Sequence, residues 1–485
     1  MSANIADVLP RHRDLHYGGD WHRAHGGYAT TFDPATGQCL GECAEADASD
    51  VDAAARAAHR AYPAWRALRP AERGSALRAI AARLREHAAE LALIDATDCG
   101  NPVAEMTSDV NAACAQLDYF AGLAGEVKGE TIPMGEGAIN MTLREPFGVC
   151  ARIVAYNHPL MFIAAKMAAP LAAGNTVIMK PPEQAPLSSY RMMELIGDVV
   201  PPGVLNVVTG GAQCGAALVA HPLIPRIALI GSVPTGRAIA RAAAERLKHV
   251  TLELGGKNAC IVYPDADVDK AIAGAVAGMN FTWCGQSCGS TSRVFVHQSI
   301  HDRVVEGIVR AVQRYKPGLP TDPATTMGAL VSKAHLAKVE GMIASGRAEG
   351  ATLACGGERP NDPKLANGYF MPPTIFTQVN QSMRIANEEI FGPVLCVLPW
   401  TDEAAMLADV NAVEYGLSAS IFTRDLTTAH RCASRVDAGY IWINTTGRHF
   451  LGAPFGGYKQ SGQGREECFD ELVGYTQQKN VHIAL

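Results

Sequence analysis

A regular alternation of short apolar runs and helical patterns between residues 148 and 262 constrains this chain more than any other feature. Short apolar runs bounded by turn residues predict buried strands, and apolar residues spaced three and four apart predict helices. Because strands that alternate with helices lie parallel, the segment predicts an α/β fold with a parallel sheet covered by helices. The predicted strands are 149–155, 176–179, 204–208, 226–230 and 250–254, and the predicted helices are 159–173, 187–198, 215–220 and 235–247.

The rest of the chain predicts helices on one side of this segment and a second α/β stretch on the other. Residues 50–96 are rich in alanine and arginine and predict amphipathic helices, which Pro63 and Pro70 divide. At 485 residues the chain is long enough for two or three domains. The remaining elements are predicted as a helix at 102–125, an extended excursion at 126–145, an α/β stretch from 259 to 450 and a terminal strand at 473–484.

Composition excludes several classes of protein. The net charge is −6 and no basic block occurs, which argues against a nucleic-acid partner. The thirteen cysteines form no spaced framework and predict reduced thiols in a cytoplasm, with no metal site. The first ten residues lack the cationic and apolar regions of a secretory signal, and no apolar stretch is long enough to span a membrane.

A cysteine and a glutamate in glycine-containing motifs predict covalent catalysis. Cys288 closes the stretch Phe281-Thr-Trp-Cys-Gly-Gln-Ser-Cys288, and Glu253 stands earlier in Leu252-Glu-Leu-Gly-Gly-Lys-Asn258. A thiol can attack a carbonyl carbon, and a carboxylate in the same cavity can activate the water that releases the product. A free cysteine is more often a small core residue. Glycines on both sides of Cys288 favour the catalytic interpretation, because they let a ligand approach the backbone closely.

These motifs resemble those of the aldehyde dehydrogenase superfamily, in which Gly-Gln-x-Cys marks the nucleophile and Glu-Leu-Gly-Gly-Lys the general base. By this match Cys288, rather than Cys284, is the nucleophile and Glu253 is the base. The resemblance also implies that Asn157, in Ala155-Tyr-Asn-His-Pro159, binds the oxyanion. From sequence alone, the favoured interpretation of Asn157 is a plain helix N-cap before Pro159.

Two charged residues, Lys166 and Glu466, match family positions linked to proton relay from the base. Taken alone, each could be a surface charge or half of a structural ion pair. The residues after Glu466 are Glu467 and Cys468, where the family commonly has glycine at the second position. The sequence gives no functional account of that change.

The cofactor is predicted to bind where strands of the parallel sheet end. The strand at 226–230 runs into Gly231-Ser-Val-Pro-Thr-Gly236 and then a helix, a turn that lets backbone approach a phosphate. Alone this is an ordinary turn, but the resemblance implies a dinucleotide site. A glutamate at 183 would repel a 2′-phosphate, so NAD is expected rather than NADP. The cofactor residues implied by the match are Lys180, Glu183, Gly215, Gly231, Ser232, Gly236, Leu254, Glu389 and Phe391.

The resemblance covers nearly the whole chain and implies an aldehyde dehydrogenase-like fold with three parts. An NAD-binding, Rossmann-like domain of five strands is expected at 1–119 and 143–255. A second α/β domain at 256–465 would carry Cys288, and a small β arm at 120–142 and 466–485 would join subunits into a homodimer or homotetramer.

The expected reaction is NAD-dependent oxidation of an aldehyde to an acid through a thioester on Cys288. Polar residues in the implied pocket predict a bulky or ring-bearing aldehyde with hydroxyl or carboxylate substituents, although Arg448 and His449 could simply face solvent. A CoA-acylating enzyme and a non-catalytic structural protein are the alternatives. Glu253 argues against the first, and the intact Cys288 and Asn157 argue against the second. The implied pocket residues are His158, Met161, Phe162, Ala165, Thr282, Ser287, His449 and Phe455.

Overall fold

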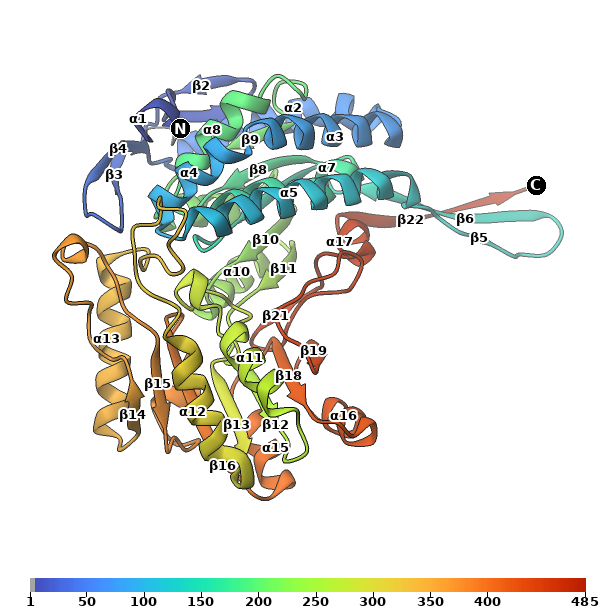
Figure 1. The fold of residues 1–485 in the computed structure, drawn as a ribbon. Coiled ribbons are helices and arrows are strands. Elements are labelled where there is room, and N and C mark those ends of the chain that lie inside the picture. The colour runs from blue at the N-terminus through green and yellow to red at the C-terminus, as the bar shows by residue number, and fades with distance from the viewer. Residues whose placement is uncertain (1–4) are drawn as a thin grey trace.

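The computed structural model describes residues 5–485 and contains two large sheets covered by helices, with a small sheet that projects from the body (Figure 1). The first large sheet has the strand order β2-β1-β9-β8-β7-β10-β11-β21. Its central strands run parallel, which confirms the predicted five-stranded sheet. They are β7 (Val149–Ile153), β8 (Thr176–Lys180), β9 (Leu205–Val207), β10 (Arg226–Ile230) and β11 (His249–Glu253).

Short antiparallel strands extend this sheet at both edges. On one side β1 (Leu15–Tyr17) pairs with β9 and then with β2 (Asp20–His22). On the other side β21 (Gly462–Gln463) pairs with β11 and brings the end of the chain back to the sheet. A separate hairpin is formed by β3 (Tyr28–Phe32) and β4 (Cys39–Ala44).

Both faces of the first sheet are buried under helices. Every position of β8 is buried, as expected for a central strand covered on two sides. Apolar side chains of α3 to α8 pack on one face, and those of α2, α9 and α10 pack on the other. The helices are α1 (Ile5–Val8), α2 (Ala48–Ala67), α3 (Pro70–Glu86), α4 (Ala88–Cys99), α5 (Val103–Leu123), α6 (Pro159–Ala165), α7 (Ala168–Ala173), α8 (Leu187–Ile196), α9 (Ala212–Ala220) and α10 (Val233–Ala244).

The second large sheet has the order β14-β15-β16-β13-β12-β18-β19 and is also covered on both faces. Only β14 runs antiparallel to its neighbour. Its strands are β12 (Ala259–Val262), β13 (Arg293–His297), β14 (Thr352–Cys355), β15 (Thr374–Thr377), β16 (Val394–Trp400), β18 (Ser418–Phe422) and β19 (Tyr440–Ile443). Around it lie α11 (Val268–Gly278), the 3₁₀ helix η2 (Phe281–Trp283), α12 (His301–Val312), α13 (Lys333–Ala348), α14 (Arg384–Asn387), α15 (Glu403–Asn411) and α16 (Leu426–Ala433). The last helix, α17 (Phe469–Val473), packs instead against α5 and α7 of the first sheet's helical layer.

The projecting arm is a three-stranded antiparallel sheet with the C-terminus at its tip (Figure 1). Strand β6 (Ala138–Pro146) pairs along its length with β22 (Thr476–Ala484), and β5 (Thr131–Ile132) pairs with its other edge. The predicted arm bounds, 120–142 and 466–485, therefore need correction. Residues 120–123 still belong to α5 because Phe120 and Ala121 pack in the core. Pairing with β22 carries β6 four residues further than predicted.

Prolines account for two further differences from the sequence prediction. The predicted helix at 159–173 is divided into α6 and α7, because Pro170 can neither donate a hydrogen bond to the Lys166 carbonyl nor fit beside it. Pro63, in contrast, lies inside α2 without dividing it. Pro63 and His59, whose carbonyl loses its donor, are both exposed to water. Among residues 5–485 no helix is long and apolar enough to cross a membrane.

Candidate active site

Two cavities meet beside Cys288. The first, here called the sheet-edge cavity, has a volume of about 320 Å³ and lies where β7, β8, β10 and β11 end. The second, here called the α5 cavity, has a volume of about 410 Å³ and lies between α5, α6 and the loops at 280–289 and 442–467. Cys288 and Glu253 line both cavities. A molecule in either cavity can therefore reach the same sulfur and the same carboxylate.

A tightly held loop presents the Cys288 thiol at this junction. The amide of Asn258 donates to the Cys288 carbonyl at 2.7 Å and to the Ser290 carbonyl at 3.0 Å. Gly285 has a left-handed φ of 70°, and a Cβ there would overlap the Gly392 carbonyl, so only glycine fits. Cys284 is 1% exposed and packs in the core of the second sheet. Of the two cysteines in this motif, Cys288 alone lines a cavity.

Burial keeps the Cys288 thiol protonated near neutral pH. Desolvation first, and then the nearby carboxylates of Glu389 and Glu253, raise the pKa of Cys288 to about 12. A thiol is a weak nucleophile until it loses its proton. The site must therefore provide a base to activate it.

Glu253 has the properties of such a base. It is the last residue of β11, and both of its carboxylate oxygens are buried without a hydrogen-bond partner. Burial, with a further contribution from the negative charge of Glu466, raises the pKa of Glu253 well above its usual value. A carboxylate with a raised pKa binds a proton more readily, and no group within the described residues competes for its lone pairs.

Two cations keep Glu466 ionised, in contrast to Glu253, whose pKa is raised. Its Oε1 accepts from Arg152 at 2.7 Å, and its Oε2 lies 2.9 Å from the Lys166 ammonium. Burial alone would raise the pKa of Glu466, but Arg152 and Lys166 outweigh it and lower that pKa to about 2. Lys166 and Glu466 are thus brought together, as a buried ion pair in the wall of the α5 cavity.

Asn157 lies in the loop between β7 and α6 and lines the sheet-edge cavity. Its carbonyl accepts from the Asn101 amide at 2.9 Å, which fixes the backbone. The side-chain amide of Asn157 has no hydrogen-bond partner among the described residues, so its N–H groups can donate to a ligand.

The other predicted cofactor residues surround the sheet-edge cavity or support it. Glu389 accepts from the Gly256 N–H at 2.9 Å, and a Cβ on Gly255 would overlap its carboxylate. Gly236 packs against Leu254, where a Cβ would come within 2.7 Å of the leucine side chain. Gly215 and Gly236 are not in the cavity wall. The predicted residues that line it are Lys180, Glu183, Gly231, Ser232, Leu254, Glu389 and Phe391.

A sequence model described as the aldehyde dehydrogenase family matches residues 21–481. The chain belongs to the aldehyde dehydrogenase family. Aldehyde dehydrogenase tropH of Talaromyces stipitatus is 52% identical over 489 residues, covering 99% of this chain and 95% of the relative. A betaine aldehyde dehydrogenase of Mesorhizobium japonicum is 43% identical and covers 93% of this chain and 92% of its own. An NAD+ complex of an aldehyde dehydrogenase from Bacillus cereus has a TM-score of 0.96 at 39% identity, covering 100% of this chain and 99% of its own.

Six of the eight predicted pocket residues of this aldehyde dehydrogenase line the α5 cavity: His158, Met161, Phe162, Ser287, His449 and Phe455. The other two need correction. Ala165 is buried in the main core because it sits on the face of α6 that packs inward. Thr282 lies outside the cavity wall, and its hydroxyl interacts with Glu105. In the 3₁₀ turn of η2 the next residue, Trp283, takes the place expected for Thr282.

Sequence reasoning missed a face of α5 that lines this aldehyde dehydrogenase's second cavity. Asp109, Ala112 and Gln116 follow one another at spacings of three and four, which places them on one side of the helix. Asp109 and Gln116 are polar and buried, and polar residues seven apart on one face of a helix are a signal that could have been noticed. The other residues that were missed are Ala115, Ile230, Asn280, Trp283, Gly289, Trp442, Gly447, Leu451 and Glu467.

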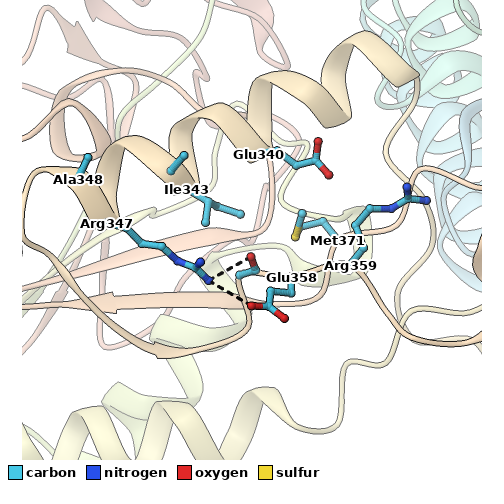
Figure 2. A pocket seen from close by; sticks show the side chains of 9 residues that line it. Glu340, Ile343, Arg347, Ala348, Glu358, Arg359 and Met371 are labelled. Atoms are coloured by element: carbon cyan, nitrogen blue, oxygen red, sulfur yellow. Dashed lines mark hydrogen bonds and ion pairs between the residues drawn. The ribbon is translucent and has the colours of Figure 1, made fainter.

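A larger cavity of about 490 Å³ lies elsewhere, beside α13 (Figure 2). Its two arginines are paired with other groups of the protein, and Arg359 donates to the carbonyls of Ala366 at 3.0 Å and Gly368 at 2.7 Å. Arg347 donates to the Gly357 carbonyl at 3.4 Å and pairs with Glu358 at 3.9 Å. The nine residues that line it include no cysteine or histidine. Within residues 5–485 no group of three His, Cys, Asp or Glu side chains could hold a metal ion.

Proposed function

We propose that this aldehyde dehydrogenase uses NAD to oxidise an aldehyde to a carboxylic acid through a covalent intermediate on Cys288. The observation that carries the proposal is the shared wall of the two cavities. Cys288 and Glu253 line both, so a cofactor in one and an aldehyde in the other would meet at the sulfur.

The residues of the sheet-edge cavity fit a dinucleotide. Ser232 caps the N-terminus of α10, where free backbone N–H groups favour a phosphate. Lys180 and Glu183 follow β8 and suit ribose hydroxyls, and Glu389 would hold the second ribose near Cys288. The Bacillus cereus relative was solved as an NAD+ complex, which supports the same choice here. When bound, NAD accepts the hydride that leaves the aldehyde carbon.

In the first chemical step Glu253 takes the proton of the Cys288 thiol, and the sulfur bonds to the aldehyde carbon. The carbonyl oxygen becomes an oxyanion. The free amide of Asn157 and the backbone N–H of Cys288 are the proposed donors to it. Loss of hydride from the carbon leaves a thioester on Cys288.

Before the second step Glu253 releases the proton that it took from Cys288 to solvent. It then removes a proton from a water molecule, which attacks the thioester carbon. The carbon–sulfur bond breaks, the acid leaves, and the Cys288 thiolate regains a proton. Lys166 and Glu466 act here as positioning residues. The ionised Glu466 raises the proton affinity of Glu253, while Arg152 and Lys166 keep Glu466 ionised.

Two properties of the whole molecule are proposed alongside the reaction. The arm exposes the apolar side chains of Ile132, Met134, Ile139 and Leu143, which suits pairing with a second copy as a homodimer or homotetramer. The thirteen cysteines form no disulfide, as expected in a reducing cytoplasm. Light scattering after gel filtration tests the oligomer.

A single assay tests the reaction. NADH absorbance is followed with a panel of aliphatic and aromatic aldehydes, with and without CoA. Acid and NADH formed without CoA support the proposal. NADH that forms only with CoA would instead favour thioester transfer, and the absence of NADH from every aldehyde would contradict the proposal.

A further inference from the structure

The α5 cavity contains polar groups that the proposed chemistry does not use. Two histidine–carboxylate pairs lie in its wall. Nδ1 of His158 lies 2.8 Å from Asp109 Oδ2, and Nδ1 of His449 lies 3.0 Å from Glu467 Oε2. The second ring nitrogen, Nε2, has no partner among residues 5–485 in either histidine. These groups therefore offer hydrogen bonds to whatever fills the cavity.

Two further buried atoms in the same wall lack partners. The side-chain carbonyl of Gln116 and the indole N–H of Trp283 are both buried without a hydrogen bond. Gln116 is only 5% exposed. Buried polar atoms are nearly always paired, so one acceptor and one donor left open in one cavity point to a ligand. A hydroxyl group can satisfy both kinds of atom, because it donates and accepts.

Glu467, whose side chain lies in this wall, has a strained backbone conformation. Glu467 has a left-handed φ of 64°, which residues other than glycine rarely adopt. Its N–H donates to Glu471 at 2.7 Å, which fixes that conformation. Strain of this kind persists where the surrounding structure enforces it, and it gathers at ligand sites.

Glu467 also sets which nitrogen of His449 faces a ligand. Burial would raise the pKa of Glu467, but the hydrogen bond from His449 outweighs it and lowers that pKa, so the carboxylate is ionised. An ionised carboxylate fixes the proton on Nδ1 of a neutral imidazole and leaves Nε2 as an acceptor. His449 is then suited to receive a hydrogen bond from a hydroxyl.

Aromatic side chains complete the wall. The ring of His158 lies 5.2 Å from that of Phe162 and 5.4 Å from that of Trp283, and the His449 ring lies 4.4 Å from that of Phe455. Flat apolar surfaces of this kind suit a planar ring. The cavity volume of about 410 Å³ is within the range of pockets that hold small ligands.

We propose that the α5 cavity selects a ring-bearing aldehyde with hydroxyl substituents, and that Gln116, Trp283 and the His449–Glu467 pair are its specificity-determining residues. This rests on the proposed function, since it assigns the substrate of the same site.

The charge of the α5 cavity wall favours hydroxyl over carboxylate substituents on the substrate ring. Asp109 and Glu467 place two carboxyl groups in the wall, and the Lys166 ammonium in it is already paired with Glu466. A carboxylate on the ring would meet like charge without a free cation. Arg448 is exposed and outside the wall. The structure thus narrows the sequence expectation, which allowed hydroxyl or carboxylate substituents.

The open hydrogen-bonding groups of the α5 cavity favour hydroxylated rings over cationic aldehydes. A trimethylammonium group has no N–H or O–H to donate, so it would leave the buried Gln116 carbonyl unpaired on binding. Burying an unpaired acceptor is costly, and a site built for a hydroxyl rejects analogues that lack one. Cationic aldehydes are therefore expected to be poor substrates.

The test compares kcat/KM for benzaldehyde, meta- and para-hydroxybenzaldehyde, para-carboxybenzaldehyde and betaine aldehyde. In the wild-type enzyme the better hydroxybenzaldehyde should exceed each of the others by roughly 10- to 100-fold. The variants Gln116→Met and Glu467→Gln each remove one polar feature at nearly constant volume, and Trp283→Phe removes the indole N–H together with part of the ring. Gln313→Met makes the first of these changes on the exposed end of α12 and is the matched control.

Each wall variant should lower the ratio of hydroxybenzaldehyde to benzaldehyde kcat/KM, chiefly through KM, while Gln313→Met keeps it. Three independent variants are used, and the melting temperature of each shows whether it folds. Equal loss for both aldehydes in the folded variants would overturn the proposal, as would a wild-type preference for the carboxylated or cationic aldehyde. NADH from all aldehydes without preference overturns the selectivity alone, whereas no NADH from any aldehyde overturns the proposed function itself.

Discussion

The two cavities that meet at Cys288 are formed by different parts of the chain. The sheet-edge cavity rests on the ends of parallel strands and on glycines whose missing side chains leave room for its walls. The α5 cavity is built from faces of α5 and α6 and from two loops, and its polar side chains largely pair with one another. The first is specified mainly by backbone geometry and the second by side-chain identity. A substitution in the first should therefore affect every substrate, and one in the second should affect some more than others.

The largest expected effect lies at the junction of the cavities. Cys288→Ala removes the sulfur that both cavities share, and kcat should fall by on the order of 10⁴-fold or more. NAD binding, measured by calorimetry, should remain. Cys284→Ala is the control, because Cys284 lies in the core. If Cys284→Ala abolished turnover and Cys288→Ala did not, the wrong cysteine has been assigned.

The second-largest effect is expected for Glu253→Gln, which distinguishes thioester formation from thioester hydrolysis. Glu253→Gln keeps the shape of the side chain but removes the base, so steady-state kcat should fall by roughly 10²- to 10⁴-fold. Rapid mixing should show a burst of NADH followed by a stall, since thioester hydrolysis needs the base most. Steady turnover near the wild-type rate would remove Glu253 from the mechanism.

A third prediction tests the backbone character of the sheet-edge cavity. In Gly255→Ala the new Cβ would overlap the Glu389 carboxylate and displace it. The KM for NAD should rise by roughly 10- to 100-fold with every aldehyde alike. A rise in the KM for NAD that differed between aldehydes would contradict the assignment of separate roles to the two cavities.

A fourth prediction concerns the thiol of the cofactor-free enzyme. Because burial and carboxylates raise the pKa of Cys288 to about 12, the thiolate fraction should increase about tenfold per pH unit between neutral pH and pH 9. The rate of inactivation by iodoacetamide should follow that slope. A rate that levels off near neutral pH would mean that the thiol is already ionised.

The smallest effect is expected at the outer end of the sheet-edge cavity. Glu183 should disfavour the 2′-phosphate of NADP, but it is exposed, so water screens the repulsion. The preference for NAD attributable to this carboxylate should be roughly fivefold in kcat/KM. Glu183→Gln should remove that share, and an unchanged NAD to NADP ratio would show that Glu183 does not contribute.

The same contrast explains what the sequence could predict. The central strands were predictable because each is a short apolar run between turns, and the motifs around Cys288 and Glu253 are local. The division of the helix at 159–173 into α6 and α7 could also have been predicted, since Pro170 cannot donate a hydrogen bond to the Lys166 carbonyl. The pairing of Asp109 with His158 was not, because it depends on how α5 packs against α6. The bare carboxylate of Glu253 is likewise a product of tertiary structure.

That bare carboxylate has a consequence for the stability of the fold. A buried carboxyl group whose pKa is raised binds its proton more tightly in the folded state than in the unfolded chain. Its contribution to the free energy of unfolding must therefore decrease as pH rises above the unfolded value, near 4.5. The decrease ends at the raised folded pKa, above which Glu253 has lost its proton and can act as a base.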